Sequence, residues 1–266
     1  MRRAIFILSQ KGGSGKSTFS RALLDHLRYA RGQAVAAFDA DGQVGQLAQH
    51  YGRRDSRGEL LPRQDALSGV VSFDLRDPGQ RGQIIDALDV PAGTLLFDLP
   101  AGGLGELGQV IGGGRGLSPL LDVYEAEAVR LTVAVVISNV QASTANVPAA
   151  IAAFGDRVDY LAVKNLFYGS PEDFLFFEGF TAADGRAYGG QARQALARHG
   201  GEVFEMPALP GREYALCDLY SLPFSEAARH PALRRAERAG VELFLREFGR
   251  EADRLGKYFG CEEGVA

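Results

Sequence analysis

The fold follows from the stretch Ala4-Ile5-Phe6-Ile7-Leu8-Ser9-Gln10-Lys11-Gly12-Gly13-Ser14-Gly15-Lys16-Ser17-Thr18 near the amino terminus. The apolar run at 4–8 predicts a buried strand, and a helix-patterned stretch begins at Phe19. Between them lies a glycine-rich segment with two lysines and a Ser-Thr pair. In such a strand–loop–helix context, backbone N–H groups and the helix N-terminus bind phosphates. Residues 11–18 therefore predict a phosphate-binding loop.

The residue types of this loop suggest separate tasks. Lys16 can reach the β- and γ-phosphates of a nucleotide, and the Ser17 hydroxyl can ligate the Mg²⁺ that they carry. The ordinary P-loop has Gly six residues before this lysine, where Gln10 stands here, and an extra lysine, Lys11, precedes the paired glycines. The expected nucleotide contacts within the loop come from Gly12, Gly13, Ser14, Gly15, Lys16, Ser17 and Thr18.

Composition narrows the class of protein. The chain has 266 residues, 46% hydrophobic and 23% charged, which is enough for a substantial core. No run approaches the ~18 apolar residues of a membrane span, and because the first strand is expected within about four residues of Met1, we expect no signal peptide. Only two cysteines occur, far apart, so we expect a reducing, cytoplasmic setting. The net charge of −4 argues against a generally basic nucleic-acid binder, although not against a local basic patch.

Strand and helix patterns alternate along the whole chain, which predicts an α/β fold with a doubly wound, mostly parallel sheet flanked by helices. No repeat or linker divides the chain, so we expect a single domain over residues 1–266. The aromatic-rich segment 166–187 predicts a loop or short helix. Further strands are expected at 34–38, 93–97, 131–138, 158–164 and 202–206, and helices at 19–30, 43–50, 79–89, 118–129, 143–154, 188–199 and 231–258.

Carboxylates end two of the expected strands. Asp39 and Asp41 close the second strand, and Asp98 closes the strand at 93–97. Ligands of doubly wound sheets bind outside the carboxyl ends of the strands. Aspartates there can also cap the following helix, but beside a triphosphate they are suited to holding Mg²⁺ and positioning an attacking water. Together with the loop, they predict a nucleotide-hydrolysing site.

The loop with its extra Lys11 resembles the deviant P-loop of the ParA/MinD group of ATPases. The segment Asp39-Ala40-Asp41-Gly42-Gln43 is similar to the Asp-x-Asp-Pro-Gln of that group, with Gly42 in place of Pro. The resemblance implies that Asp41 activates water and that Asp39 supports the metal. It extends over most of the chain, from residue 4 to about 210, and implies a P-loop ATPase that uses ATP and Mg²⁺.

Three further segments carry the resemblance. Asp98-Leu99-Pro100-Ala101-Gly102 resembles a Walker B carboxylate joined to a γ-phosphate sensor, so Asp98 is expected near the metal. Asn165 looks like the adenine-contacting Asn of the group, and Met206-Pro207 like its second purine wall. The family's extra lysine implies that Lys11 reaches the phosphates of a partner subunit, so that hydrolysis depends on formation of a homodimer.

The sequence leaves open which biological role, and which cargo, such an ATPase would serve. A ParA-like partition or positioning ATPase would bind DNA nonspecifically, and an arginine cluster before and at the start of the last helix suits that role: Arg229, Arg234, Arg235 and Arg238. A MinD-like membrane-cycling ATPase would need a terminal amphipathic helix with a basic rim. The helix 241–259 has balanced charges beside its apolar stripe, so we expect it to pack in the core. A ligase-like relative with the same loop is a further alternative, and an adaptor protein that stimulates hydrolysis is expected but unidentified.

Overall fold

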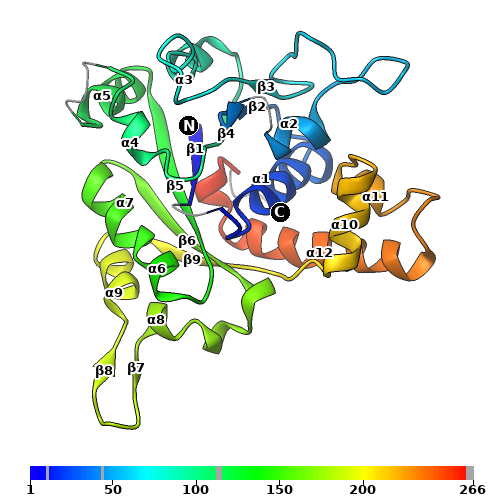
Figure 1. The fold of residues 1–266 in the computed structure, drawn as a ribbon. Helices are drawn as coiled ribbons and strands as arrows, with labels where there is room; N and C mark the ends of the chain where they lie inside the picture. Colours follow the sequence, from blue (N-terminus) through cyan, green and yellow to red (C-terminus); the bar gives the residue numbers. More distant parts are fainter. Residues whose placement is uncertain (10–11, 43–44, 112–115, 262–266) are drawn as a thin grey trace.

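The computed structural model describes residues 1–9, 12–42, 45–111 and 116–261, and its centre is a seven-stranded parallel sheet (Figure 1). The strand order is β3-β2-β4-β1-β5-β6-β9. The strands are β1 (Arg2–Leu8), β2 (Val35–Asp39), β3 (Val71–Ser72), β4 (Thr94–Asp98), β5 (Val129–Ile137), β6 (Asp159–Asn165) and β9 (Glu202–Met206), with a separate antiparallel hairpin of β7 (Phe180–Thr181) and β8 (Ala187–Tyr188). The helices are α1 (Lys16–Asp25), α2 (Gln46–Tyr51), α3 (Gln83–Asp86), α4 (Leu104–Leu107), α5 (Ser118–Ala126), α6 (Gln141–Thr144), α7 (Asn146–Phe154), α8 (Leu175–Glu178), α9 (Gln191–Arg198), α10 (Gly211–Leu219), α11 (Phe224–Ala227) and α12 (Arg235–Arg254).

Helices cover both faces of the sheet, and the alternation of side chains along each strand builds two cores. In β1, Phe6 points into the core formed with α3, α5, α7 and α9. Its neighbours Ile5 and Ile7 point into the opposite core, formed with α1, α2, α11 and α12. The two helical layers lie on either side of the sheet in Figure 1. The expected doubly wound, parallel α/β fold is therefore confirmed.

Most elements lie where the pattern predicts them, but several boundaries differ. The helix expected at 118–129 ends at Ala126, because Ala128 has a positive φ of 53° and β5 begins at Val129. The helix expected at 188–199 begins only at Gln191, after two glycines. Inside 166–187, the chain forms short 3₁₀ turns, α8 and the β7–β8 hairpin. The short strand β3 and helices α10 and α11 had no clear sequence signal.

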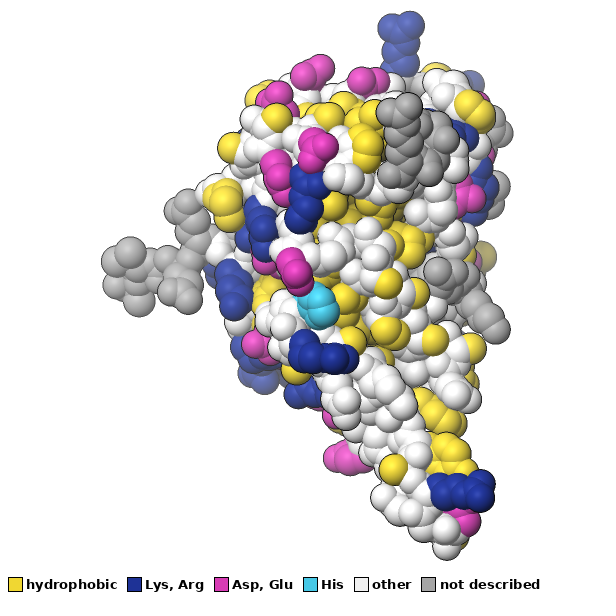
Figure 2. Space-filling view, turned by 90° about the vertical axis from the view of Figure 1, so that its left-hand side faces the viewer, with side chains coloured by type: hydrophobic (Ala, Val, Ile, Leu, Met, Phe, Trp, Pro, Cys, Tyr) yellow, Lys and Arg dark blue, Asp and Glu magenta, His cyan; other side chains and the backbone are white. Residues whose placement is uncertain are grey.

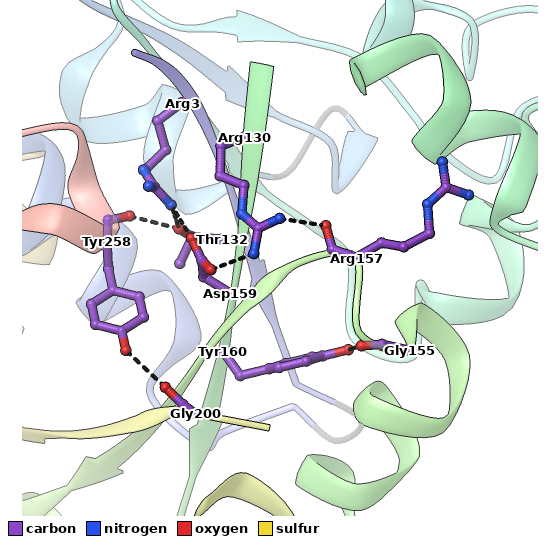
Figure 3. A network of polar contacts seen from close by, with 9 residues as sticks. All are labelled: Arg3, Arg130, Thr132, Gly155, Arg157, Asp159, Tyr160, Gly200 and Tyr258. Carbon is purple, nitrogen blue, oxygen red and sulfur yellow. Dashed lines mark hydrogen bonds and ion pairs between the residues drawn. The ribbon is translucent and has the colours of Figure 1, made fainter. Parts of the chain in front are cut away.

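Ion pairs hold the amino ends of the strands together, at the edge of the sheet opposite the loop (Figure 3). Arg3 of β1 donates to Asp159 of β6 at 2.6 Å, and Arg130 of β5 donates to the other oxygen of the same carboxylate at 2.6 Å. Burial alone would raise the pKa of Asp159, but the hydrogen bonds from the two guanidinium groups bring it below its usual range. Thr132 donates to the carbonyl of Tyr258 at 2.7 Å, which attaches the chain after α12 to the sheet.

The β7–β8 hairpin projects from the body of the protein, and hydrophobic side chains run along it (Figures 1 and 2). The rings of Phe180 and Tyr188 stack across the hairpin with centroids 5.7 Å apart. At its base, the buried ammonium of Lys164 pairs with Glu178 at 2.5 Å. Within the described ranges, no helix has both the length and the apolar character needed to cross a membrane.

Candidate nucleotide site

The phosphate-binding loop joins the end of β1 to the start of α1. Gly13 and Gly15 both have a positive φ, 86° and 94°, so the chain turns sharply before the helix begins at Lys16. A Cβ at Gly15 would lie 2.1 Å from Nδ2 of Asn165, so only glycine fits there. The first-turn N–H groups of α1, which have no partner within the helix, face the loop and form an anion-binding cradle.

A cavity of about 400 Å³ opens over this cradle. The loop contributes Gly12, Gly13, Gly15, Lys16, Ser17 and Thr18 to its lining, which does not include Ser14, and Ser9, Asp41, Gln46 and Ala101 also line it. The remaining lining residues are mostly apolar or aromatic: Asn165, Phe167, Tyr168, Pro207, Leu209, Gly211 and Tyr214. The lining therefore offers polar groups to anionic phosphates and apolar surface to a flat ring.

Lys16 lies at the bottom of the cradle and is already held in place. Its ammonium is only 2.6 Å from Oδ1 of Asp98, and both side chains are buried. Asp98 ends β4 and is the register partner of Asp39 at the end of β2. The carboxyl ends of adjacent parallel strands thus bring Asp98 and Asp39 together beside Lys16, the first residue of α1, as their positions in the sequence predicted.

Asp39 is completely buried beside a second carboxylate. Its oxygens accept from the backbone N–H groups of Ala48 at 3.0 Å and Asp41 at 3.3 Å. Desolvation, and next to it the charge of Asp98, raise the pKa of Asp39 to about 7. A second negative charge beside Asp98 is therefore unfavourable at this buried position, and an added cation would favour the ionised form of Asp39.

Asp41 lies at the rim of the cavity, where its Oδ1 accepts from Nη2 of Arg76 at 2.9 Å. Sequence reasoning missed Arg76, because it stands in an irregular connector without motif or periodicity.

Asn165 and Tyr168 line the cavity and also contact the phosphate-binding loop. The side-chain amide of Asn165 donates to the carbonyl of Ser14 at 2.9 Å and accepts from the N–H of Phe167, so it braces the loop while also lining the cavity. Tyr168 donates its hydroxyl to the carbonyl of Gly13. Pro207 lines the cavity, whereas Met206 is buried and packs beneath Gly15. The aromatic segment noted in the sequence thus supplies Phe167 and Tyr168, but Tyr214 had no signal.

Two sets of expected residues lie elsewhere. Arg229, Arg234 and Arg235 are exposed and Arg238 is half-buried, before and at the start of α12, outside the cavity lining. Lys11 and Gln43 lie outside the described residues.

The fold and the loop define a P-loop nucleotide-binding domain. Residues 5–203 match the family model described as the CobQ/CobB/MinD/ParA nucleotide binding domain, and the chain belongs to this family. No curated protein sequence matches the chain.

Three solved structures share the fold, each with a TM-score of 0.52. The cell division ATPase MinD of Pyrococcus furiosus is 18% identical, with 96% of this chain and 100% of that chain covered. The septum site-determining protein MinD of Pyrococcus horikoshii, complexed with Mg-ADP, is 16% identical, with 96% and 98% covered. A ParA family ATPase from Chlorobium tepidum is 12% identical, with 92% and 98% covered.

Proposed function

We propose that this protein binds Mg-ATP, hydrolyses it slowly and uses the cycle to switch an ATP-dependent homodimer, as a ParA-like ATPase of DNA partition or intracellular positioning. The observation that carries the proposal is the buried Lys16–Asp98 pair at 2.6 Å, beneath a cradle that opens into a cavity bordered by Asp41. A lysine already held in place before the nucleotide binds loses little conformational freedom when it meets the β- and γ-phosphates.

Magnesium fits this donor set as an ion shared with the nucleotide. Among the described residues, no group of three or more His, Cys, Asp or Glu side chains could hold a metal. Mg²⁺ retains several waters and binds through one or two protein oxygens plus phosphates, for which Ser17, Asp39 and Asp98 are the candidates. When bound, the ion would neutralise charge on the phosphate oxygens. Asp41 would orient the attacking water, and Asn165 and Pro207 would contact the base.

The proposed partners are a second copy of the chain, nonspecific DNA through the four arginines around the start of α12, and an adaptor protein that stimulates hydrolysis. We propose a cytoplasmic setting.

Against the MinD-like alternative, the stripe of α12 packs in the core: Val241, Phe248 and Ala252 are at most 1% exposed. Pull-down on DNA with and without ATP separates a partition role from membrane-cycling and ligase-like roles.

The nucleotide site is tested by calorimetric titration of Mg-ATP into wild type and Lys16→Ala. We expect Lys16→Ala to lose binding, because the cradle loses the charge that meets the β- and γ-phosphates. Lys257→Ala, an exposed lysine outside the cavity lining, serves as the matched control and should bind as wild type does. Equal affinity in wild type and Lys16→Ala would refute the site assignment.

A further inference from the structure

An ion pair at the rim of the cavity engages the proposed water-positioning residue. Nη2 of Arg76 lies 2.9 Å from Oδ1 of Asp41, and its Nη1 lies 3.6 Å from Oδ1 of Asp74. Asp41 lines the cavity but Arg76 does not. The guanidinium therefore acts on the site through Asp41, and Oδ2 of Asp41 has no protein partner among the described residues.

The backbone attaches Arg76 to the segment that carries Asp41. The N–H of Phe73 donates to the carbonyl of Asp39 at 3.0 Å, and the N–H of Leu75 donates to the carbonyl of Ala40 at 3.1 Å. In the reverse direction, the N–H of Gly42 donates to the carbonyl of Phe73 at 3.1 Å. Three hydrogen bonds thus join residues 73–75 to residues 39–42, so the carboxylate and its guanidinium partner are held in one unit.

Gly42 supplies one of these three hydrogen bonds. Its φ is +78°, and a Cβ there would lie 3.4 Å from a carboxylate oxygen of Asp74. Proline fixes φ near −65° and has no N–H, so it can neither adopt this conformation nor donate to Phe73. The sequence motif that this segment resembles has Pro at the position of Gly42. The chain therefore differs from the motif at the position where the connector that carries Arg76 is hydrogen-bonded to the segment that carries Asp41.

We propose that Arg76 is a positioning residue that fixes the orientation of the Asp41 carboxylate, and that Gly42 provides the backbone geometry for it. This inference rests on the proposed ATP hydrolysis. With Oδ1 held by the guanidinium, Oδ2 is the oxygen left to accept from water. Positioning of this kind acts on the chemical step, because a misplacement of about 1 Å can cost on the order of a hundredfold in rate.

The test is steady-state ATP hydrolysis by wild type, Arg76→Ala, Arg76→Lys and Asp41→Ala. Arg76→Ala should lower kcat about tenfold or more and leave KM for ATP unchanged, because Arg76 lies outside the cavity lining. Arg76→Lys should restore part of kcat, since it keeps the charge but not the planar fork. Asp41→Ala should lower kcat further while retaining ATP, and adding Arg76→Ala to it should cause no additional loss.

A matched control is Arg57→Ala, which removes an exposed arginine that pairs with Asp55 at 3.3 Å in a distant connector. It should hydrolyse ATP as wild type does. Gly42→Pro should lower kcat as Arg76→Ala does, without removing the guanidinium, and urea unfolding checks that both variants fold.

Two outcomes separate this inference from the proposed function. If wild type hydrolyses ATP, Asp41→Ala does not, and Arg76→Ala keeps or exceeds the wild-type kcat, the positioning role is overturned alone. A wild type without hydrolysis would overturn the proposed function and this inference together.

Discussion

At the scale of single residues, the carboxyl groups of Asp39 and Asp98 are buried close together, and the ammonium of Lys16 lies beside Asp98. Asp39 and Asp98 are at most 1% exposed and are register partners on neighbouring strands, while the ammonium of Lys16 bonds Asp98. Burial and the nearby charge of Asp98 raise the pKa of Asp39 to about 7. An acid that binds its proton more tightly in the folded chain contributes a destabilisation that is absent below about pH 4 and complete above about pH 7.

Asp39→Asn removes this titration while keeping one acceptor oxygen. In the absence of nucleotide and Mg²⁺, with a chelator present, we expect the variant to gain stability relative to wild type as pH rises from 5 to 8. The gain in free energy of unfolding between these pH values should be on the order of 2 kcal/mol, because the ionised carboxylate is costly only in wild type. Urea unfolding midpoints at both pH values measure it.

The exposed Asp89 provides the control for this experiment. Asp89→Asn should change the midpoint equally at pH 5 and pH 8. A difference between Asp39→Asn and wild type that stays constant with pH would show that Asp39 is ionised throughout the range.

At the scale of elements, α12 closes one core against α1 and β9. Phe248 is fully buried, and its ring centroid lies 5.6 Å from that of Phe19 on α1 and 5.0 Å from that of Phe204 on β9. This contact places the last long helix behind the helix that begins at the phosphate-binding loop. The apolar stripe predicted from the sequence is therefore a packing surface.

Phe248→Ala should lower the free energy of unfolding by about 3–5 kcal/mol, the range for removal of a fully buried aromatic ring. Urea unfolding monitored by circular dichroism measures the change. The control is Leu243→Ala in the same helix, where the side chain is 43% exposed and the expected effect is small. Equal losses in the two variants would contradict the packing role assigned to Phe248.

At the scale of the whole molecule, the cavity lies at the carboxyl edge of the sheet, with the loop and Asp41 in its lining. The Arg3–Asp159–Arg130 network holds the strands together at the opposite edge. We expect the second copy in the proposed homodimer to approach the carboxyl edge of the sheet. The proposed cross-subunit role of Lys11, a residue outside the described part of the chain, belongs to this scale.

Lys11→Ala should still bind ATP through its own Lys16 but should not form the ATP-dependent dimer. Two triphosphates facing each other would then lack their bridging cations, and like charges at close range repel. Analytical ultracentrifugation with ATP measures the dimer, and the specific activity of wild type should rise with protein concentration. A Lys11→Ala protein that dimerises as wild type does would refute the cross-subunit role.

Much of the fold and part of the site could be predicted because their signals are local. The phosphate-binding loop is contiguous, and each principal strand is a short apolar run bounded by turn residues. Asp39 and Asp98 could be expected together because parallel strands place their carboxyl ends at one edge. The exception is β3, which has two residues and too little pattern to be recognised.

The sequence by itself thus determined the parallel α/β sheet, the phosphate-binding loop and the carboxylates at the strand ends, since each depends on neighbouring residues and strand periodicity. Only the tertiary structure decided which side chains meet. Arg76 reaches Asp41 across 35 residues, and Asn165 braces Ser14 across 151. The first contact depends on how a connector without periodicity returns to the sheet, which is set by packing and by the backbone conformation at Gly42. The second depends on the order of the strands, because Asn165 ends β6 and the loop follows β1. No local pattern encodes either.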